Sequence, residues 1–166
     1  MTRIWKTEGF VEADPWVIET EERKAGEGER VVLPLAEFVA KAEESNEAGF
    51  GVLIAPADDV KALQPYLDRV DLVAVAFPAF NDGRAFSHAS LLRERLGFKG
   101  EVRAVGDVLI DQIPLMLRTG ITSFAVTNAT ALKRLEQGRL PGIEEHYQPT
   151  AAESCPVGGY SWRRRA

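Results

Sequence analysis

Four short, mainly apolar runs in the chain constrain its fold most strongly. They lie at 52–55, 72–77, 102–105 and 123–126, and their starts are 20, 30 and 21 residues apart. Strands that are buried on both faces of a parallel sheet have this continuous apolar character. The spacings leave room for a helical crossover between successive strands. The pattern predicts repeated βα units with about four parallel strands, arranged either as an open sheet or as half of an eight-stranded barrel.

Helical segments are expected between and around these runs. Leu35, Phe38, Val39 and Ala42 recur on one helical face directly after Pro34, and Gly49 is placed to end that helix. A segment from about residue 58 contains Pro65, which predicts two short pieces. Three further helices are expected to begin at the N-cap residues Ser87, Asp111 and Asn128, the first ending at Gly97 and the last at Gly138.

The N-terminal part is expected to add a β-hairpin at about 16–33. Its β-prone arms are 16–18 and 31–33, and the polar segment between them contains two glycines. Residues 1–150 then form one α/β domain, with βα units over about 34–140, and residues 151–166 form a flexible tail. The tail contains Cys155 and the basic run 163–165. If the fold is a half-barrel, its unpaired edges favour a homo-oligomer.

Composition excludes several classes of protein. The chain has 166 residues, a net charge of −5 and a single cysteine, so no intrachain disulfide can form. The acidic balance argues against general nucleic-acid binding. The longest apolar run is far shorter than the roughly 20 residues that span a bilayer, and the N-terminus lacks the apolar stretch of a signal peptide. We therefore expect a cytoplasmic protein with no membrane partner.

The long loop after the second apolar run contains a first group of candidate site residues. It carries Asp82, Arg84, Ser87 and His88 beside the start of a helix. Parallel sheets bind ligands at the carboxyl ends of their strands, and a helix start presents free N–H groups. Arg84 would supply a planar donor fork for an oxyanion, whereas the alternative is a plain turn in which Arg84 pairs with Asp82 structurally.

The third apolar run supplies a second group. Asp107 follows this run directly and is a candidate general base, with Asp82 as the other catalytic carboxylate. Arg103 lies within the run, where a charged side chain needs a partner, and is a candidate anion ligand. Because consecutive βα units usually place their strands side by side, we expect Asp82, Arg84 and Asp107 to lie near one another.

No cofactor motif is present in the sequence. The glycine-rich dinucleotide fingerprint and the phosphate-binding loop are absent, and one cysteine with two histidines cannot provide a zinc, haem or iron–sulfur ligand set. We therefore predict no metal and no tightly bound cofactor. A noncovalent flavin is not excluded by this reasoning.

Several blocks of the sequence resemble a family of bacterial proteins, the domain of unknown function 934 family. The matching blocks are 77–87, 91–97, 100–109, 111–112 and 147–148. The resemblance implies a link to sulfur assimilation, because members are commonly encoded beside assimilatory sulfite reductase and are often labelled probable oxidoreductases of sulfite reduction.

Three functions follow as hypotheses. The first is an accessory protein of assimilatory sulfite reduction that binds a small oxyanion, the reductase or another sulfur-assimilation protein. The second is an enzyme, an oxidoreductase by the family label, that acts on a small anionic substrate at the strand ends. The third is a non-catalytic structural subunit whose exposed sheet edge pairs with a partner.

Overall fold

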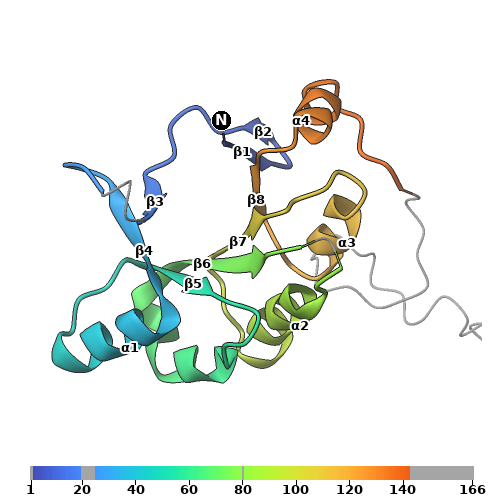
Figure 1. Ribbon diagram of the computed structural model, residues 1–166. Helices are drawn as coiled ribbons and strands as arrows, with labels where there is room; N and C mark the ends of the chain where they lie inside the picture. The colour runs from blue at the N-terminus through green and yellow to red at the C-terminus, as the bar shows by residue number, and fades with distance from the viewer. Residues whose placement is uncertain (1, 20–24, 80, 143–166) are drawn as a thin grey trace, which may run out of the picture.

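A single eight-stranded sheet organises the protein, which we describe from a computed structural model covering residues 2–19, 25–79 and 81–142 (Figure 1). The order of the strands across the sheet is β2-β1-β8-β7-β6-β5-β4-β3. Their bounds are β1 Arg3–Lys6, β2 Gly9–Phe10, β3 Trp16–Ile18, β4 Arg30–Pro34, β5 Phe50–Ile54, β6 Val70–Phe77, β7 Glu101–Gly106 and β8 Ser123–Val126.

Helices follow the strands from β4 onward and complete an α/β fold. They are α1 Leu35–Glu44, the 3₁₀ helix η1 Val60–Arg69, α2 Arg84–Ser90 continued by the π-helical turn η2 Leu91–Arg95, α3 Ile113–Arg118 and α4 Ala129–Glu136. No helix in these ranges is both long and apolar enough to cross a membrane.

The predicted parallel strands are confirmed, and the run of parallel pairing is longer than expected. β3 to β8 lie in sequence order, and each pairs in parallel with the next strand of this run. An N-terminal hairpin is also present, but it joins β1 to β2, and β1 then pairs antiparallel with β8. The predicted hairpin at 16–33 is therefore wrong. Its two arms are neighbouring strands, but they pair in parallel, because the connection carries the chain back to the same end of the sheet.

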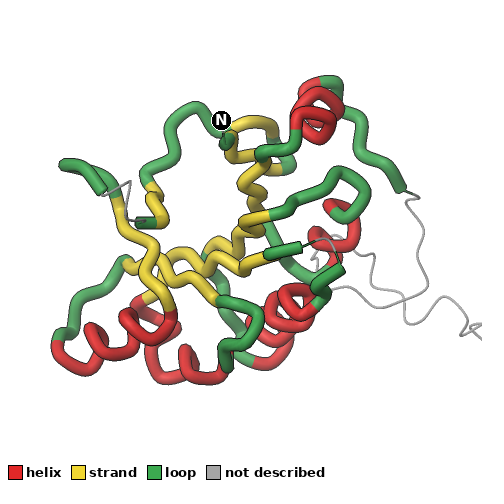
Figure 2. The backbone as a smooth tube through the Cα atoms, in the orientation of Figure 1, coloured by secondary structure: helices red, strands yellow, loops and turns green. Residues whose placement is uncertain are grey.

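The sheet curls into a half-barrel, which decides between the two predicted architectures (Figure 2). β2 and β3 lie at opposite edges, yet only residues 11–15 connect them. Eight strands laid flat would be about 34 Å across. The connection from Phe10 to Trp16 can span at most about 20 Å. The edges must therefore approach one another, and residues 11–15, here called the strap, bridge the gap between them.

The two faces of the curled sheet bury different sets of side chains. Val73, Val75 and Phe77 of β6 point to the convex face and pack with the helices in the main core. Leu72 and Ala74 alternate with them and point to the concave face, where the apolar cluster contains strand residues and no helical ones. The helices thus cover one face of the sheet, and the concave face is left to the strap and the N-terminal strands.

Three helix boundaries differ from the predictions for local reasons. α2 begins at Arg84 instead of after Ser87, because the Asp82 carboxylate accepts the Arg84 N–H and satisfies the first turn. α3 begins after Gln112, not Asp111, with Pro114 in its first turn. α1 ends at Glu44, well before Gly49. At this end of the helix the Arg69 side chain donates hydrogen bonds to the carbonyls of Ala42, Ser45 and Glu47.

The remaining helical predictions also have definite outcomes. η1 runs through Pro65 as one 3₁₀ segment, not two pieces, and Asp59 caps it by accepting the Lys61 N–H. The start of α4 is as predicted, since the Asn128 carboxamide oxygen accepts the Ala131 N–H. The predicted tail at 151–166, with Cys155, lies outside the described residues.

Candidate functional site

Asp82 and Arg84 form a self-contained ion pair after β6. The Asp82 carboxylate accepts hydrogen bonds from Arg84 Nε at 3.0 Å and Nη2 at 2.7 Å. These hydrogen bonds, side-chain first and then backbone, lower the pKa of Asp82 to about 2. The Arg84 side chain remains 59% exposed. Arg84 thus carries a charge that is already neutralised at short range by a residue two positions away.

Asp107 lies at the end of the neighbouring strand, as the adjacency of β6 and β7 requires. Its backbone N–H donates to the Phe77 carbonyl at 2.7 Å. Gly106 precedes it with φ +98°, and a Cβ there would lie 2.3 Å from the Phe77 carbonyl oxygen. The loop start is therefore held tightly. Within the described ranges, however, no hydrogen bond or ion pair joins the exposed Asp107 side chain to Asp82 or Arg84.

Ser87 and His88 lie on α2 beside this loop. Ser87 is exposed, whereas His88 is half-buried, and its Nδ1 is buried without a hydrogen-bond partner. Burial lowers the pKa of His88, and the Asp58 carboxylate only partly offsets the effect. His88 is consequently neutral at pH 7, which makes it a poor electrostatic partner for an oxyanion.

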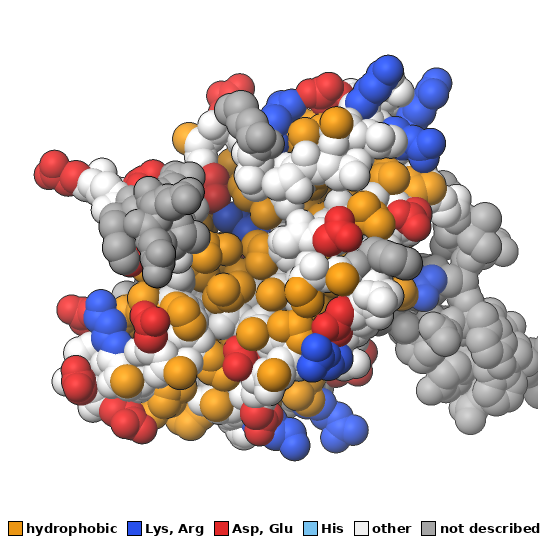
Figure 3. Space-filling model, viewed as in Figure 1, with side chains coloured by type: hydrophobic (Ala, Val, Ile, Leu, Met, Phe, Trp, Pro, Cys, Tyr) orange, Lys and Arg blue, Asp and Glu red, His pale blue; other side chains and the backbone are white. Residues whose placement is uncertain are grey.

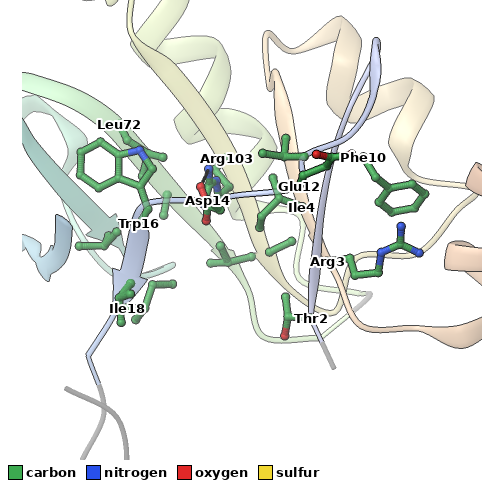
Figure 4. Close-up of a pocket in the computed structure, with 16 residues that line it drawn as sticks. Thr2, Arg3, Ile4, Phe10, Glu12, Asp14, Trp16, Ile18, Leu72 and Arg103 are labelled. Carbon is green, nitrogen blue, oxygen red and sulfur yellow. Dashed lines mark hydrogen bonds and ion pairs between the residues drawn. The ribbon is translucent and has the colours of Figure 1, made fainter. Parts of the chain in front are cut away.

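Arg103 belongs to a different site, on the concave face of β7. Its side chain is only 5% exposed. Nη1 and Nη2 donate to the two carboxylate oxygens of Asp14 in the strap, at 2.6 and 2.8 Å (Figure 4). Nη2 also donates to Glu101 Oε1 at 2.7 Å, and Nε donates to Ser123 Oγ at 3.2 Å. We predicted that Arg103, a charged residue within a strand, needs a partner. It has three, which come from the strap, from β7 and from β8.

The network around Arg103 is electrically balanced. Glu101 accepts a hydrogen bond from Lys6 Nζ at 2.7 Å, so two cations face two anions, Glu101 and Asp14. Burial would raise the pKa of Glu101, but hydrogen bonds from Lys6 and Ser123 together with the Arg103 charge outweigh it and lower the pKa. The same balance means that Arg103 has no uncompensated charge to offer a free oxyanion.

A hollow of about 610 Å³ lies on the concave face around this network. Hydrophobic side chains gather in it between β3 and the β1–β8 side of the sheet (Figure 3). Its apolar lining comes from five parallel strands, β3, β4, β6, β7 and β8, together with β1, β2 and the strap. Its polar lining is the Arg103–Asp14 pair with Thr2, Arg3 and Glu12. The apolar lining includes Ile4, Trp16, Ile18, Leu72, Val105 and Ala125. A concave, mostly apolar cavity with a few convergent polar groups is the usual form of a binding site.

The site residues predicted from sequence thus fall into two places. Asp82, Arg84, Ser87, His88 and Asp107 are at the carboxyl ends of β6 and β7, where no hydrogen bond links Asp107 to the others in the described part of the chain. Arg103 is in the hollow. The sequence analysis missed Asp14, Glu101 and Trp16, and the signal that could have found the first two was the unpaired charge of Arg103 within an apolar strand.

No group of three or more His, Cys, Asp or Glu side chains that could hold a metal ion occurs within residues 2–19, 25–79 and 81–142. At the strand ends Asp82 is already engaged by Arg84, and in the hollow Asp14 and Glu101 are already engaged by Arg103.

The curled sheet, the helices on its convex face and the open hollow on its concave face together define an α/β half-barrel protein. The chain belongs to the family described as bacterial protein of unknown function (DUF934), whose model matches residues 51–158. That range starts within β5 and leaves out the N-terminal strands and the strap, which supply Asp14 and Trp16. A comparison with curated proteins finds no match.

Proposed function

We propose that this protein is a non-catalytic accessory protein of assimilatory sulfite reduction that binds the reductase through its hollow. The link to sulfite reduction rests on what the family resemblance implies. The single observation that favours a binding role is the concave face, which carries apolar side chains and is covered by none of the helices in the described part of the chain. Uncovered apolar concavities of this kind are typical of interaction sites.

The charges of the site favour a protein partner over a free oxyanion. Sulfite is compact and strongly hydrated, and binding it requires unpaired donors. Arg84 is occupied by Asp82, and Arg103 is occupied by Asp14 and Glu101. The hollow instead offers a largely apolar lining around one fixed ion pair, which suits a protein surface that brings apolar side chains.

The same geometry argues against acid–base catalysis at the strand ends. The hydrogen bonds from Arg84 lower the pKa of Asp82 to about 2, so its carboxylate is a very weak base near neutrality. It would have to give up its pair with Arg84 to accept a proton. Asp107 has no hydrogen-bonded partner there to orient its side chain, among the residues described.

The test is binding of purified assimilatory sulfite reductase from the same source, measured by calorimetry. Ile18 lines the hollow and is half-buried, so Ile18→Glu is expected to weaken binding by about tenfold or more. Leu115 on α3 is 41% exposed and lies outside the hollow, so Leu115→Glu is the matched control and should bind as the wild type does. Absence of binding by the wild type, or equal loss in both variants, would contradict the proposal.

Complementation of growth on sulfate as the sole sulfur source gives the cellular readout. Ile18→Glu should fail to restore growth of a deletion strain, whereas Leu115→Glu should restore it. Light scattering on the same samples detects self-association, which would favour the structural-subunit hypothesis instead.

A further inference from the structure

The strap crosses the open side of the half-barrel and is tethered by one side chain. Its ends are held by backbone hydrogen bonds, from Val11 N–H to the Ile4 carbonyl and from Arg30 N–H to the Pro15 carbonyl. Between them, in this described segment, Glu12, Ala13 and Asp14 make no backbone hydrogen bond. The bidentate pair between Asp14 and Arg103 is therefore what holds the middle of the strap over the hollow (Figure 4).

Arg103 cannot lose Asp14 without a replacement. The guanidinium stays charged, lies 5% exposed and is fixed from below by Glu101 and Ser123. When Asp14 leaves, Arg103 and Lys6 face Glu101 alone, and the hollow gains one net positive charge. An uncompensated buried charge is unfavourable, whereas exchanging the Asp14 carboxylate for another one restores the charge balance and the two hydrogen bonds that Asp14 accepted.

The surroundings of Arg103 specify what else the incoming group must carry. Ala74 of β6 and Ala125 of β8 line the cavity on either side of β7, the strand that carries Arg103, and Leu72 and Val105 also line it. Barrel interiors are normally filled by bulky branched side chains, so the two alanines leave space that a bound group can fill. The occupant that fits therefore combines a carboxylate with adjacent apolar side chains.

We propose that Asp14 occupies the place of a partner carboxylate, and that the reductase inserts an acidic side chain flanked by apolar residues, displacing Asp14 from Arg103 and moving the strap aside. The inference rests on the proposed function and adds the chemistry of the partner segment and the gate that admits it. The charge balance carries the inference, since only an anionic group can release the strap and keep the two cations, Arg103 and Lys6, matched by two anions.

The experiment compares reductase affinity for the wild type, Asp14→Asn and Glu8→Gln. An asparagine loses the ion pair and competes poorly for Arg103, so a larger fraction of the protein has the hollow open. The apparent Kd equals the intrinsic Kd divided by that fraction, so Asp14→Asn should bind about tenfold more tightly than the wild type. Glu8 lies in the turn between β1 and β2, is exposed, does not line the hollow and forms no ion pair in the described part of the chain, so Glu8→Gln should bind like the wild type.

A small probe tests the gate without the reductase. Hexanoate carries a carboxylate on an apolar chain, and hexylamine has the same chain with the opposite charge. Titration followed by NMR at the Trp16 indole should show hexanoate binding to Asp14→Asn more tightly than to the wild type, and no binding of hexylamine to either.

The outcomes separate the two proposals. If the wild type binds the reductase and Asp14→Asn binds equally well or more weakly, the gate is overturned and the proposed function stands. Failure of the reductase to bind any variant overturns the proposed function, and the hexanoate titration still decides whether Asp14 gates a carboxylate site. Equal binding of hexanoate and hexylamine overturns the charge argument.

Discussion

The indole ring of Trp16 lies directly over the backbone of Gly51, two strands away across the concave face. A Cβ on Gly51 would lie 2.8 Å from Trp16 Cζ3 and 2.9 Å from the Val32 side chain. The ring also packs against the Arg30 guanidinium, whose Cζ lies 4.0 Å from the ring centroid. This contact folds the edge strand β3 over the sheet and helps to give the hollow its wall.

Gly51→Ala is expected to lower the free energy of unfolding by about 1–3 kcal/mol, because the new methyl group forces Trp16 or Val32 to shift. Urea denaturation measures the loss. At Gly26 a Cβ would meet Glu29 at an ordinary 3.5 Å, so Gly26→Ala is the control and should cause no loss. Equal stability of both variants would show that the ring does not press on Gly51.

Arg103→Ala is expected to destabilise the protein by about 3–5 kcal/mol, since it leaves the Asp14 and Glu101 carboxylates without their buried partner. Arg84 is also paired with an aspartate, but its side chain is 59% exposed, so Arg84→Ala should leave the melting temperature nearly unchanged. Thermal and urea unfolding of the two variants measure this contrast. A similar loss in both would mean that burial does not distinguish the pairs.

Arg69→Ala is expected to cost about 1.5–3 kcal/mol. Its guanidinium donates to three carbonyls at and beyond the end of α1, and removing it leaves those acceptors to water or to no partner. Arg95 is exposed at the end of η2, so Arg95→Ala serves as the control and should change stability by less than about 0.5 kcal/mol. Hydrogen exchange at the amides of α1 should increase in the first variant only.

Stability should decrease as the pH falls below about 6.5, in part because of His88. Burial lowers the pKa of His88 from its ordinary value of 6.5. Between that lowered pKa and 6.5 the unfolded chain binds more protons than the folded protein, so acid favours unfolding there. Unfolding curves measured at several pH values should show a smaller decrease for His88→Leu. The neighbouring variant Ser87→Ala should keep the wild-type pH dependence, and the same profile in all three proteins would refute the assignment.

Local sequence was sufficient to predict the parallel βα units. The strands at 52–55, 72–77, 102–105 and 123–126 are confirmed within a few residues, because a strand buried on both faces requires an apolar run wherever it occurs. The helical stripe from Leu35 to Ala42 and the Asn128 cap are confirmed for the same reason, since periodicity and capping act over a single turn.

Strand direction and charge pairing depended on contacts between distant parts of the chain. Sequence placed 16–18 beside 31–33 but could not give their parallel pairing, which follows from where the sheet receives each strand. The sequence likewise showed that Arg103 needs a partner, but it did not show which residue that partner is. Asp14 lies 89 residues away, and only the curl of the sheet, with the strap across it, brings that carboxylate over β7. Burial and periodicity are properties of each segment alone, whereas the hollow and its ion pair exist only once the sheet has curled and its two edges have approached one another.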